Sequence, residues 1–253
     1  MAPSEKSLFF TKHGFKVKLT VSEEEDWSNL NTGKLAAAPT TADVLAVYGR
    51  QLHAVTPVQI GFSRGADGVV VRKGIRSINN LKGRILAASQ FNEADFFIRY
   101  LAQEAGLEVN MLPDLKTAPD LQKVNLVYCA DAFAAGDLFL RDVKTPGSNL
   151  LAGCVTWAPK TTEVADGSGG EARIMVTNRN LLIVADVLLV NKGFAQTNPK
   201  IVAGLVEGIL AGNKMVRDNP DTHLELIAQA CTTKDSKWDR AKAKAELAKV
   251  HLA

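Results

Sequence analysis

Hydrophobic and polar positions follow two different periods along the chain, and the two periods alternate. Short apolar runs rich in β-branched or small residues, such as 69–71 and 85–88, are typical of buried strands. Other segments, such as 201–209, carry apolar residues at helical spacing. Because strand-like and helix-like segments succeed one another from end to end, the pattern predicts an α/β protein with mixed, mostly parallel sheets.

The predicted elements are placed by the turn and cap residues that flank them. Strands are expected at 17–21, 69–71, 85–88, 109–112, 153–157, 174–177 and 181–190. Helices are expected after Thr41, after Asn92, up to Gly136, from Pro199, from Pro220 and across 237–253.

The clearest helix start comes directly after a predicted strand. Asn92 is a good cap residue there, and Asp95 occupies the third helical position. Backbone N–H groups at such a start can hold an anion or a polar ligand. Thr41, with Asp43 in the first turn, predicts a second helix start of the same kind.

Length and composition narrow the class of protein. The chain has 253 residues, which allows one large domain or two modest ones. Hydrophobic residues make up 46% and charged residues 23%, as in an ordinary globular protein, and a net charge of +3 does not favour a nucleic acid partner. The first residues lack the pattern of a signal peptide, and no apolar run is long enough to span a bilayer.

A search for local catalytic and metal-binding patterns gives a negative expectation. The histidines lie far apart, without metal-ligand spacing, and G-x-S-x-G, G-x-G-x-x-G and phosphate-loop patterns are absent. We therefore expect no enzyme, no metal and no cofactor. Cys129, Cys154 and Cys231 are expected to be buried free thiols, with a Cys129–Cys154 disulfide as the alternative.

Polar residues at the ends of predicted strands are the candidate ligand contacts, because ligands of α/β proteins bind outside the carboxyl ends of the strands. The candidates are Thr40, Thr41, Asp43, Ser63, Asp67, Ser89, Gln90, Phe91, Asn92, Trp157 and Asp186. Each also has a structural interpretation. Thr41 and Asn92 are possible helix caps, 63–68 a turn, Trp157 a core residue, and Asp186 a buried hydrogen-bonding group.

A series of short motifs, in order along most of the chain, carries a family resemblance. They are F-F-T-K-H-G-F-K-V at 9–17, A-P-T-T-A-D-V-L at 38–45, G-A-D-G-V-V-V at 65–71, I-N-N-L-K-G at 78–83, V-T-W-A-P at 155–159 and I-V-A-D-V at 183–187. Together they resemble the substrate-binding proteins of ABC transporters, of the nitrate, sulfonate and taurine type with its phosphate-annotated relatives.

The resemblance implies a two-lobe fold of the type II periplasmic-binding-protein kind, with a ligand in a cleft between the lobes. Lobe 1 would comprise 1–80 plus 188–253 and lobe 2 would comprise 81–187, with crossings near 72–84 and 182–192. It implies a non-enzymatic, monomeric component of an importer that captures a small anionic solute by lobe closure. A membrane permease would be its partner, in the periplasm or on the outer surface.

Departures from the family pattern keep two other hypotheses open. Little chain precedes 9–17, the segment 138–149 looks inserted, and 247–253 resembles a point inside the family's C-terminal region. We therefore expect a fragment, truncated at both ends. The alternatives are a ligand-sensing or accessory module of a larger fused protein and, less favoured, an enzyme similar to thiamine-precursor synthases.

Overall fold

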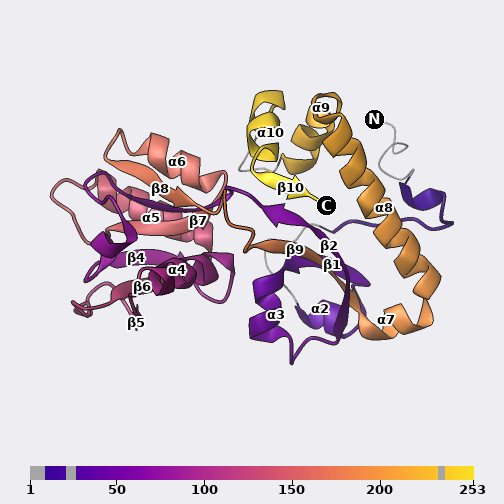
Figure 1. Cartoon of the computed structure of the whole chain (residues 1–253), viewed down its shortest axis with the longest axis horizontal. Helices are drawn as coiled ribbons and strands as arrows, with labels where there is room; N and C mark the ends of the chain where they lie inside the picture. The colour runs from indigo at the N-terminus through magenta and orange to yellow at the C-terminus, as the bar shows by residue number, and fades with distance from the viewer. Residues whose placement is uncertain (1–8, 21–26, 233–236) are drawn as a thin grey trace. The chain divides into compact units, whose positions relative to one another are not determined.

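A computed structural model of the chain describes residues 9–20, 27–232 and 237–253 (Figure 1). The chain forms two compact units. Unit 1 combines Met1–Phe62 with Ala185–Ala253, and unit 2 is Ser63–Val184. Each unit is built around its own sheet. No helix among the described residues is long and apolar enough to cross a membrane.

Unit 2 holds a six-stranded sheet in the order β5-β6-β4-β7-β3-β8. Its strands are β3 (Asp67–Arg72), β4 (Ile85–Ser89), β5 (Val109–Leu112), β6 (Val124–Cys129), β7 (Gly153–Trp157) and β8 (Ala172–Thr177). The β5–β6, β6–β4 and β4–β7 pairs are parallel, whereas β3 runs antiparallel to β7 and β8. The expected mixed, mostly parallel sheet is confirmed in this unit.

Helices cover both faces of the unit 2 sheet. They are η1 (Ile78–Leu81), α4 (Glu93–Glu104), α5 (Ala132–Lys144) and α6 (Lys160–Gly167). Successive side chains of a strand point to opposite faces, so Val69 packs with Phe97 of α4, and Val70 with Phe139 of α5 and Val164 of α6. Because both faces of the sheet are buried, the sequences of several unit 2 strands are continuous apolar runs.

Unit 1 holds a smaller sheet in the order β1-β9-β2-β10. Its strands are β1 (Ala37–Thr41), β2 (Ala54–Ser63), β9 (Ala185–Asn191) and β10 (Val250–Leu252). Both β1 and β2 pair antiparallel with β9. The expectation of a mostly parallel sheet is wrong for this unit, because β9 lies between β1 and β2 and runs in the opposite direction.

The helices of unit 1 confirm the predicted proline starts. They are α2 (Trp27–Asn31), α3 (Ala42–Tyr48), α7 (Lys192–Thr197), α8 (Pro199–Asp218), α9 (Pro220–Cys231) and α10 (Arg240–Leu247). The last helix is shorter than expected, because the chain leaves it to add β10 beside β2, where Ala253 N–H donates to the Ile60 carbonyl.

The chain passes from one unit to the other at Phe62–Ser63 and at Val184–Ala185, whereas the resemblance implied crossings near 72–84 and 182–192. The segment 72–84 lies inside unit 2, where it connects β3, paired with β7 and β8, to β4. The first division falls instead between Phe62 and Ser63. The second, between Val184 and Ala185, lies within the predicted 182–192.

Several predicted elements are wrong in extent. Residues 17–20 form no strand, and Val21 lies outside the described residues. Gly136 does not end a helix: α5 begins after Asp131, whose side chain accepts from Ala134 N–H, and runs on through most of the predicted insertion at 138–149. Residues 181–184 precede β9 without joining it.

The cysteines are all free, so the alternative disulfide is absent. Cys154 is buried, Cys129 is half-buried and Cys231 is exposed, which corrects the expectation of three buried thiols. Burial raises the pKa of the Cys154 thiol, which therefore stays protonated and packs as a small apolar group.

Gly153 is the glycine at which close backbone packing of unit 2 can be tested. A Cβ placed there would lie 2.4 Å from the Val70 carbonyl oxygen, and a backbone atom cannot turn away as a flexible side chain can. We expect Gly153→Ala to lower the free energy of unfolding by about 2 kcal/mol.

Gly212→Ala is the control, since a Cβ placed at Gly212 in α8 would have no atom within 4 Å. The control should gain about 0.5 to 1 kcal/mol from helix propensity. Equal effects of the two substitutions in urea unfolding would contradict this account of the packing.

Candidate functional site

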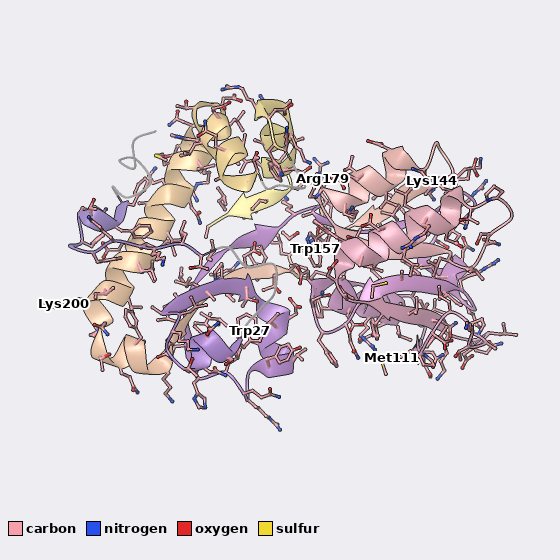
Figure 2. The ribbon with its side chains drawn as sticks, turned by 180° about the vertical axis from the view of Figure 1, so that it is seen from behind. Trp27, Met111, Lys144, Trp157, Arg179 and Lys200 are labelled. Carbon is pink, nitrogen blue, oxygen red and sulfur yellow. The ribbon has the colours of Figure 1, made fainter. Side chains whose placement is uncertain are left out.

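The carboxyl ends of the parallel strands of unit 2 meet at one edge of its sheet. Ser89 ends β4, Cys129 ends β6 and Trp157 ends β7, and the helices α4, α5 and α6 begin shortly after these residues. Figure 2 shows Trp157 at this edge and Lys144, in the last turn of α5, toward the other end of the unit. Backbone N–H groups at several helix starts therefore gather along one edge.

The loop from Ser89 to Asn92 is organised by the cap of α4. Asn92 Oδ1 accepts from the N–H groups of Ala94 at 3.1 Å and Asp95 at 3.4 Å, and its amide nitrogen donates to Ser89 Oγ. Ser89 is buried, and Phe91 has a left-handed backbone with φ of 62°. The polar groups of Ser89 and Asn92 are thus used inside the loop. Gln90 and Phe91 are the exposed members of the predicted set.

A second network, absent from the predicted set, ties α4 to β6. Asp95 Oδ1 accepts from Arg99 Nε and from the Tyr128 hydroxyl, each at 2.8 Å, and Arg99 Nη2 donates to the same hydroxyl at 2.8 Å. Burial, with the neighbouring Asp95 carboxylate, raises the pKa of Tyr128 to about 12. The helical i, i+4 spacing of Asp95 and Arg99 is the sequence signal that could have indicated this network.

Trp157 is half-buried against the core and has an aromatic neighbour that the sequence did not reveal. Its ring centroid lies 5.8 Å from that of Phe133, whose side chain is partly exposed near the start of α5. Lys160 Nζ lies 5.5 Å from the Phe133 ring centroid and also pairs with Asp137 at 3.0 Å. This edge of unit 2 therefore offers exposed aromatic surface beside its helix starts.

Ser63 and Asp67 form a buried cluster with Asn178. The Ser63 hydroxyl donates to Asp67 Oδ2, which also accepts from Asn178 Nδ2 at 2.7 Å. Asn178 Oδ1 accepts from Gly65 N–H at 2.6 Å. Much of the hydrogen-bonding capacity of Ser63 and Asp67 is thus used to fix the loop, and Asn178, which is absent from the predicted set, lies at the centre of the cluster.

The remaining predicted contacts lie together at one edge of the unit 1 sheet. Thr41 pairs in register with Asp186 of β9, Thr40 is its neighbour in β1, and Asp43 is in the first turn of α3. Thr41 stands at the cap position of α3, but its side chain makes no cap hydrogen bond. Thr41 Oγ1 and Asp43 Oδ1 are both buried atoms, and neither makes a hydrogen bond of good geometry to another described residue. Such unsatisfied buried groups are uncommon.

The two carboxyl groups of this edge are held without a counter-charge. Burial raises the pKa of Asp43, and the Thr41 hydroxyl nearby offsets part of that rise. Burial also raises the pKa of Asp186, and the negative charge of Asp43 adds to the effect. Among the described residues, no lysine, arginine or histidine forms an ion pair with either carboxyl group. The edge therefore suits a hydrogen-bond donor or a cationic group better than an anion.

The predicted residues thus fall into two sets. Thr40, Thr41, Asp43 and Asp186 lie together in unit 1, and the others lie at the carboxyl edge of unit 2 or in the loop that enters β3. Within the described part of the chain, no three His, Cys, Asp or Glu side chains are arranged to hold a metal ion.

The raised pKa of Asp43 predicts that its substitution by a neutral residue stabilises the protein, the opposite of what most substitutions do. A carboxyl group whose folded pKa is raised destabilises the native state once it ionises, so the penalty is absent below about pH 4 and present at pH 7. We expect Asp43→Asn to raise the free energy of unfolding at pH 7 by on the order of 1 kcal/mol. That gain should vanish near pH 3 to 4 in urea unfolding.

Asp142 is the matched control, because its environment lowers the pKa of its carboxyl group, whereas that of Asp43 is raised. Burial alone would raise the pKa of Asp142, but hydrogen bonds from Ser148 and Leu151 N–H and the Arg72 guanidinium at 2.7 Å outweigh burial and lower it. Asp142→Asn should cost about 3 kcal/mol at pH 7, and less as the pH falls through the native pKa. Destabilisation by both substitutions at pH 7 would contradict the account of Asp43.

Comparison with solved structures identifies the fold as that of the periplasmic binding proteins. The periplasmic aliphatic sulphonate binding protein SsuA from Escherichia coli is 15% identical with a TM-score of 0.64, and the match covers 89% of this chain and 70% of that one. The Candida albicans CA3427 gene product, described as having the generic periplasmic binding protein fold, is 12% identical with a TM-score of 0.67, covering 96% and 74%. SsuA from Xanthomonas axonopodis pv. citri, bound to MOPS, is 14% identical with a TM-score of 0.61, covering 90% and 71%.

The family follows from the sequence itself. Residues 5–223 match the family described as NMT1/THI5 like, and the chain belongs to that family. The predicted resemblance to binding proteins of the sulfonate type is confirmed. A search of curated protein sequences found no match.

Proposed function

We propose that this chain is the solute-binding component of an ABC-type importer. The observation that carries the proposal is its membership of the NMT1/THI5-like family, with a fold shared over most of its length with proteins named for sulfonate binding. The two sets of polar residues, one at a sheet edge in each unit, are the expected contacts. The partner would be a membrane permease, and the protein would act as a monomer in the periplasm or on the outer surface.

We further propose that the solute contacts both units and that the units close around it. Hinge closure of two domains is a common response to a ligand. The chain passes between the units twice, at Phe62 to Ser63 and at Val184 to Ala185, so few backbone dihedrals need to change. Gln90, Phe91 and Trp157 of unit 2, and Thr41, Asp43 and Asp186 of unit 1, are the proposed contacts.

The charges at the two edges suggest the class of solute. The helix starts of unit 2 favour an anionic group such as a sulfonate, phosphate or carboxylate. The unpaired carboxyl groups of Asp43 and Asp186 in unit 1 disfavour a second anion and favour an amine. A small solute that carries an acidic group at one end and an amino group at the other satisfies both edges.

Two other hypotheses from the sequence remain as competitors. A ligand-sensing module of a fused protein would use the same contacts, and binding without any effect on import would favour it. An enzyme similar to thiamine-precursor synthases would need a His- and Cys-bearing centre. The described histidines and Cys231 belong to unit 1, Cys129 and Cys154 belong to unit 2, and within the described part of the chain no three His, Cys, Asp or Glu side chains are arranged to hold a metal ion. A product-formation assay with iron and pyridoxal phosphate distinguishes that enzyme from a binding protein.

A matched pair of solutes tests the solute class by calorimetry. Taurine and ethanesulfonate share the sulfonate and the two-carbon chain, and differ in the amino group. We expect the chain to bind taurine at least about tenfold more tightly, because a charge-assisted hydrogen bond contributes about 1.5 to 3 kcal/mol. Asp43→Asn and Asp186→Asn should each reduce that preference to near unity.

Asp218→Asn is the control for this experiment. Asp218 is also a carboxylate of unit 1, but it pairs with Lys214 in α8, and its substitution should leave the preference unchanged. Equal binding of both solutes would contradict the proposed role of the acidic pair. Failure of all small sulfonates, phosphates, carboxylates and their amino derivatives to bind would count against the transport proposal itself.

A further inference from the structure

The segment 72–84, once expected to cross between lobes, carries an unusual concentration of positive charge. It contains five lysine or arginine residues and no acidic residue. It connects the end of β3 to the start of β4, so it lies at the edge of the unit 2 sheet opposite to Ser89 and Trp157. The proposed solute contacts at the carboxyl edge make no use of this segment.

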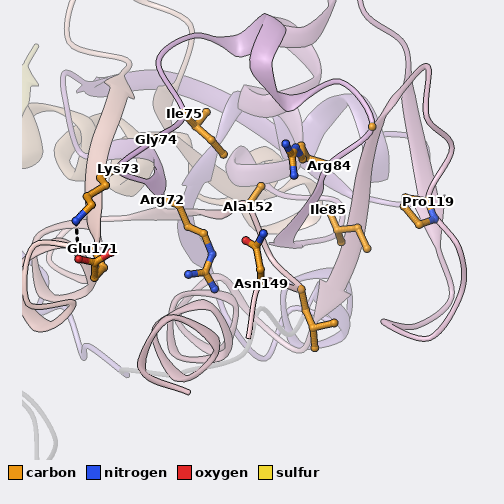
Figure 3. Close-up of a pocket in the computed structure, with 12 residues that line it drawn as sticks. Arg72, Lys73, Gly74, Ile75, Arg84, Ile85, Pro119, Asn149, Ala152 and Glu171 are labelled. Carbon is orange, nitrogen blue, oxygen red and sulfur yellow. Dashed lines mark hydrogen bonds and ion pairs between the residues drawn. The ribbon is translucent and has the colours of Figure 1, made fainter. Parts of the chain in front are cut away.

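A cavity opens beside this basic segment. Its volume is about 540 Å³, within the range of small-molecule sites, and every residue that lines it belongs to unit 2. Figure 3 shows Arg72, Lys73 and Arg84 around the same hollow, with Asn149 between them and Glu171 at its side. The cavity therefore brings three cationic side chains and one amide to a single concave surface.

The three cations are held in different ways. Arg72 is fixed by Nε donation to the Leu151 carbonyl at 2.9 Å and by Nη2 donation to Asp142 at 2.7 Å. These bonds use one side of the planar guanidinium, and its Nη1 group makes no hydrogen bond to another described residue. Lys73 pairs with Glu171 at 2.6 Å.

Of the three cations that line the cavity, Arg84 is the one that forms no ion pair with a described residue. Its side chain is exposed, and the ion pairs of the described residues do not include it. An arginine guanidinium offers several N–H donors in a fixed fork, which suits the oxygens of a phosphate group. Arg84 can therefore bind an anion without first giving up a protein contact.

We propose that this cavity binds the phosphate group of a small phosphorylated molecule, with Arg84 and Arg72 as its principal contacts. The site is separate from the solute contacts at the other edge of the sheet. No aromatic side chain lines the cavity, so it lacks the stacking surface on which single-stranded nucleic acids bind. A phosphate on a small molecule and a phosphate of a lipid headgroup share the same chemistry, and the experiment separates them.

Calorimetric titration of the full chain with inorganic pyrophosphate at an ionic strength of about 0.15 M, where exposed charges are screened, tests the site. We expect saturable binding that Arg84→Ala weakens at least about tenfold, as expected for loss of a charge-assisted contact. Arg50→Ala is the matched control, since Arg50 is also an exposed arginine and lies in unit 1. It should change the affinity by less than about twofold, because Arg50 does not line the cavity and salt screens an exposed charge outside it.

Two results of the titrations would contradict the proposal itself. No saturable binding, or equal weakening by Arg84→Ala and Arg50→Ala, would overturn it. Pyrophosphate binding that saturating taurine leaves unchanged would establish a site independent of the solute contacts, and competition between taurine and pyrophosphate would overturn the separation. Sedimentation with phosphatidylglycerol vesicles identifies the source. Vesicle binding that Arg84→Ala abolishes supports a lipid headgroup, and pyrophosphate binding without vesicle binding supports a free phosphorylated molecule.

Discussion

The position of β9 between β1 and β2 is the constraint on which unit 1 depends. The strand comes directly from unit 2, and Val187, Leu188, Leu189 and Val190 are all buried. It joins the N-terminal and C-terminal parts of the chain in one antiparallel sheet. The same register sets Asp186 opposite Thr41 and close to Asp43. One strand thus both completes the core of unit 1 and forms its acidic edge.

Burial of the Asp43 and Asp186 carboxyl groups at this acidic edge lowers the stability of the native state, and the fold alone does not explain why they are buried there. A buried carboxyl group normally has a cation or several hydrogen-bond donors beside it, as Asp142 and Asp95 do in unit 2. Asp43 and Asp186 have no cationic partner among the described residues, and each is harder to ionise than an exposed aspartate. Destabilised groups of this kind are common at binding sites, where a ligand supplies the missing partner. This contrast distinguishes the proposed solute contacts from the structural networks of unit 2.

The elements that the sequence predicted well are those whose signals are local. Helix α4 follows from the Asn92 cap, and β4, β5 and β7 follow from short apolar runs with clear boundaries. The errors concern tertiary packing. Gly136 resembles a helix end, yet it stands inside α5, where the missing side chain leaves room for Lys160 and Val164 of α6. The antiparallel course of β9 likewise depends on pairing partners far away in the chain.

The residues of the candidate site also fall into those with a local signal in the sequence and those without one. Strand ends pointed to Thr41, Asp43, Trp157 and Asp186 as a class, since a polar or aromatic residue there is visible in the sequence. Asn178 and Phe133 could not be predicted, because their roles arise from contacts with Asp67 and Trp157, which the fold brings near. The sequence also could not show that Asp43 lacks a neighbouring cation, because the fold determines which side chains surround it.

The most direct test of the central claim is a crystal structure of the chain with the solute that calorimetry identifies as the tightest binder. The account predicts one solute molecule whose acidic group lies against the helix starts near Gln90 and Trp157. Its amino group should donate to Asp43 or Asp186. A solute held by one unit alone, or one with its acidic group placed against Asp43 and Asp186, would contradict the account.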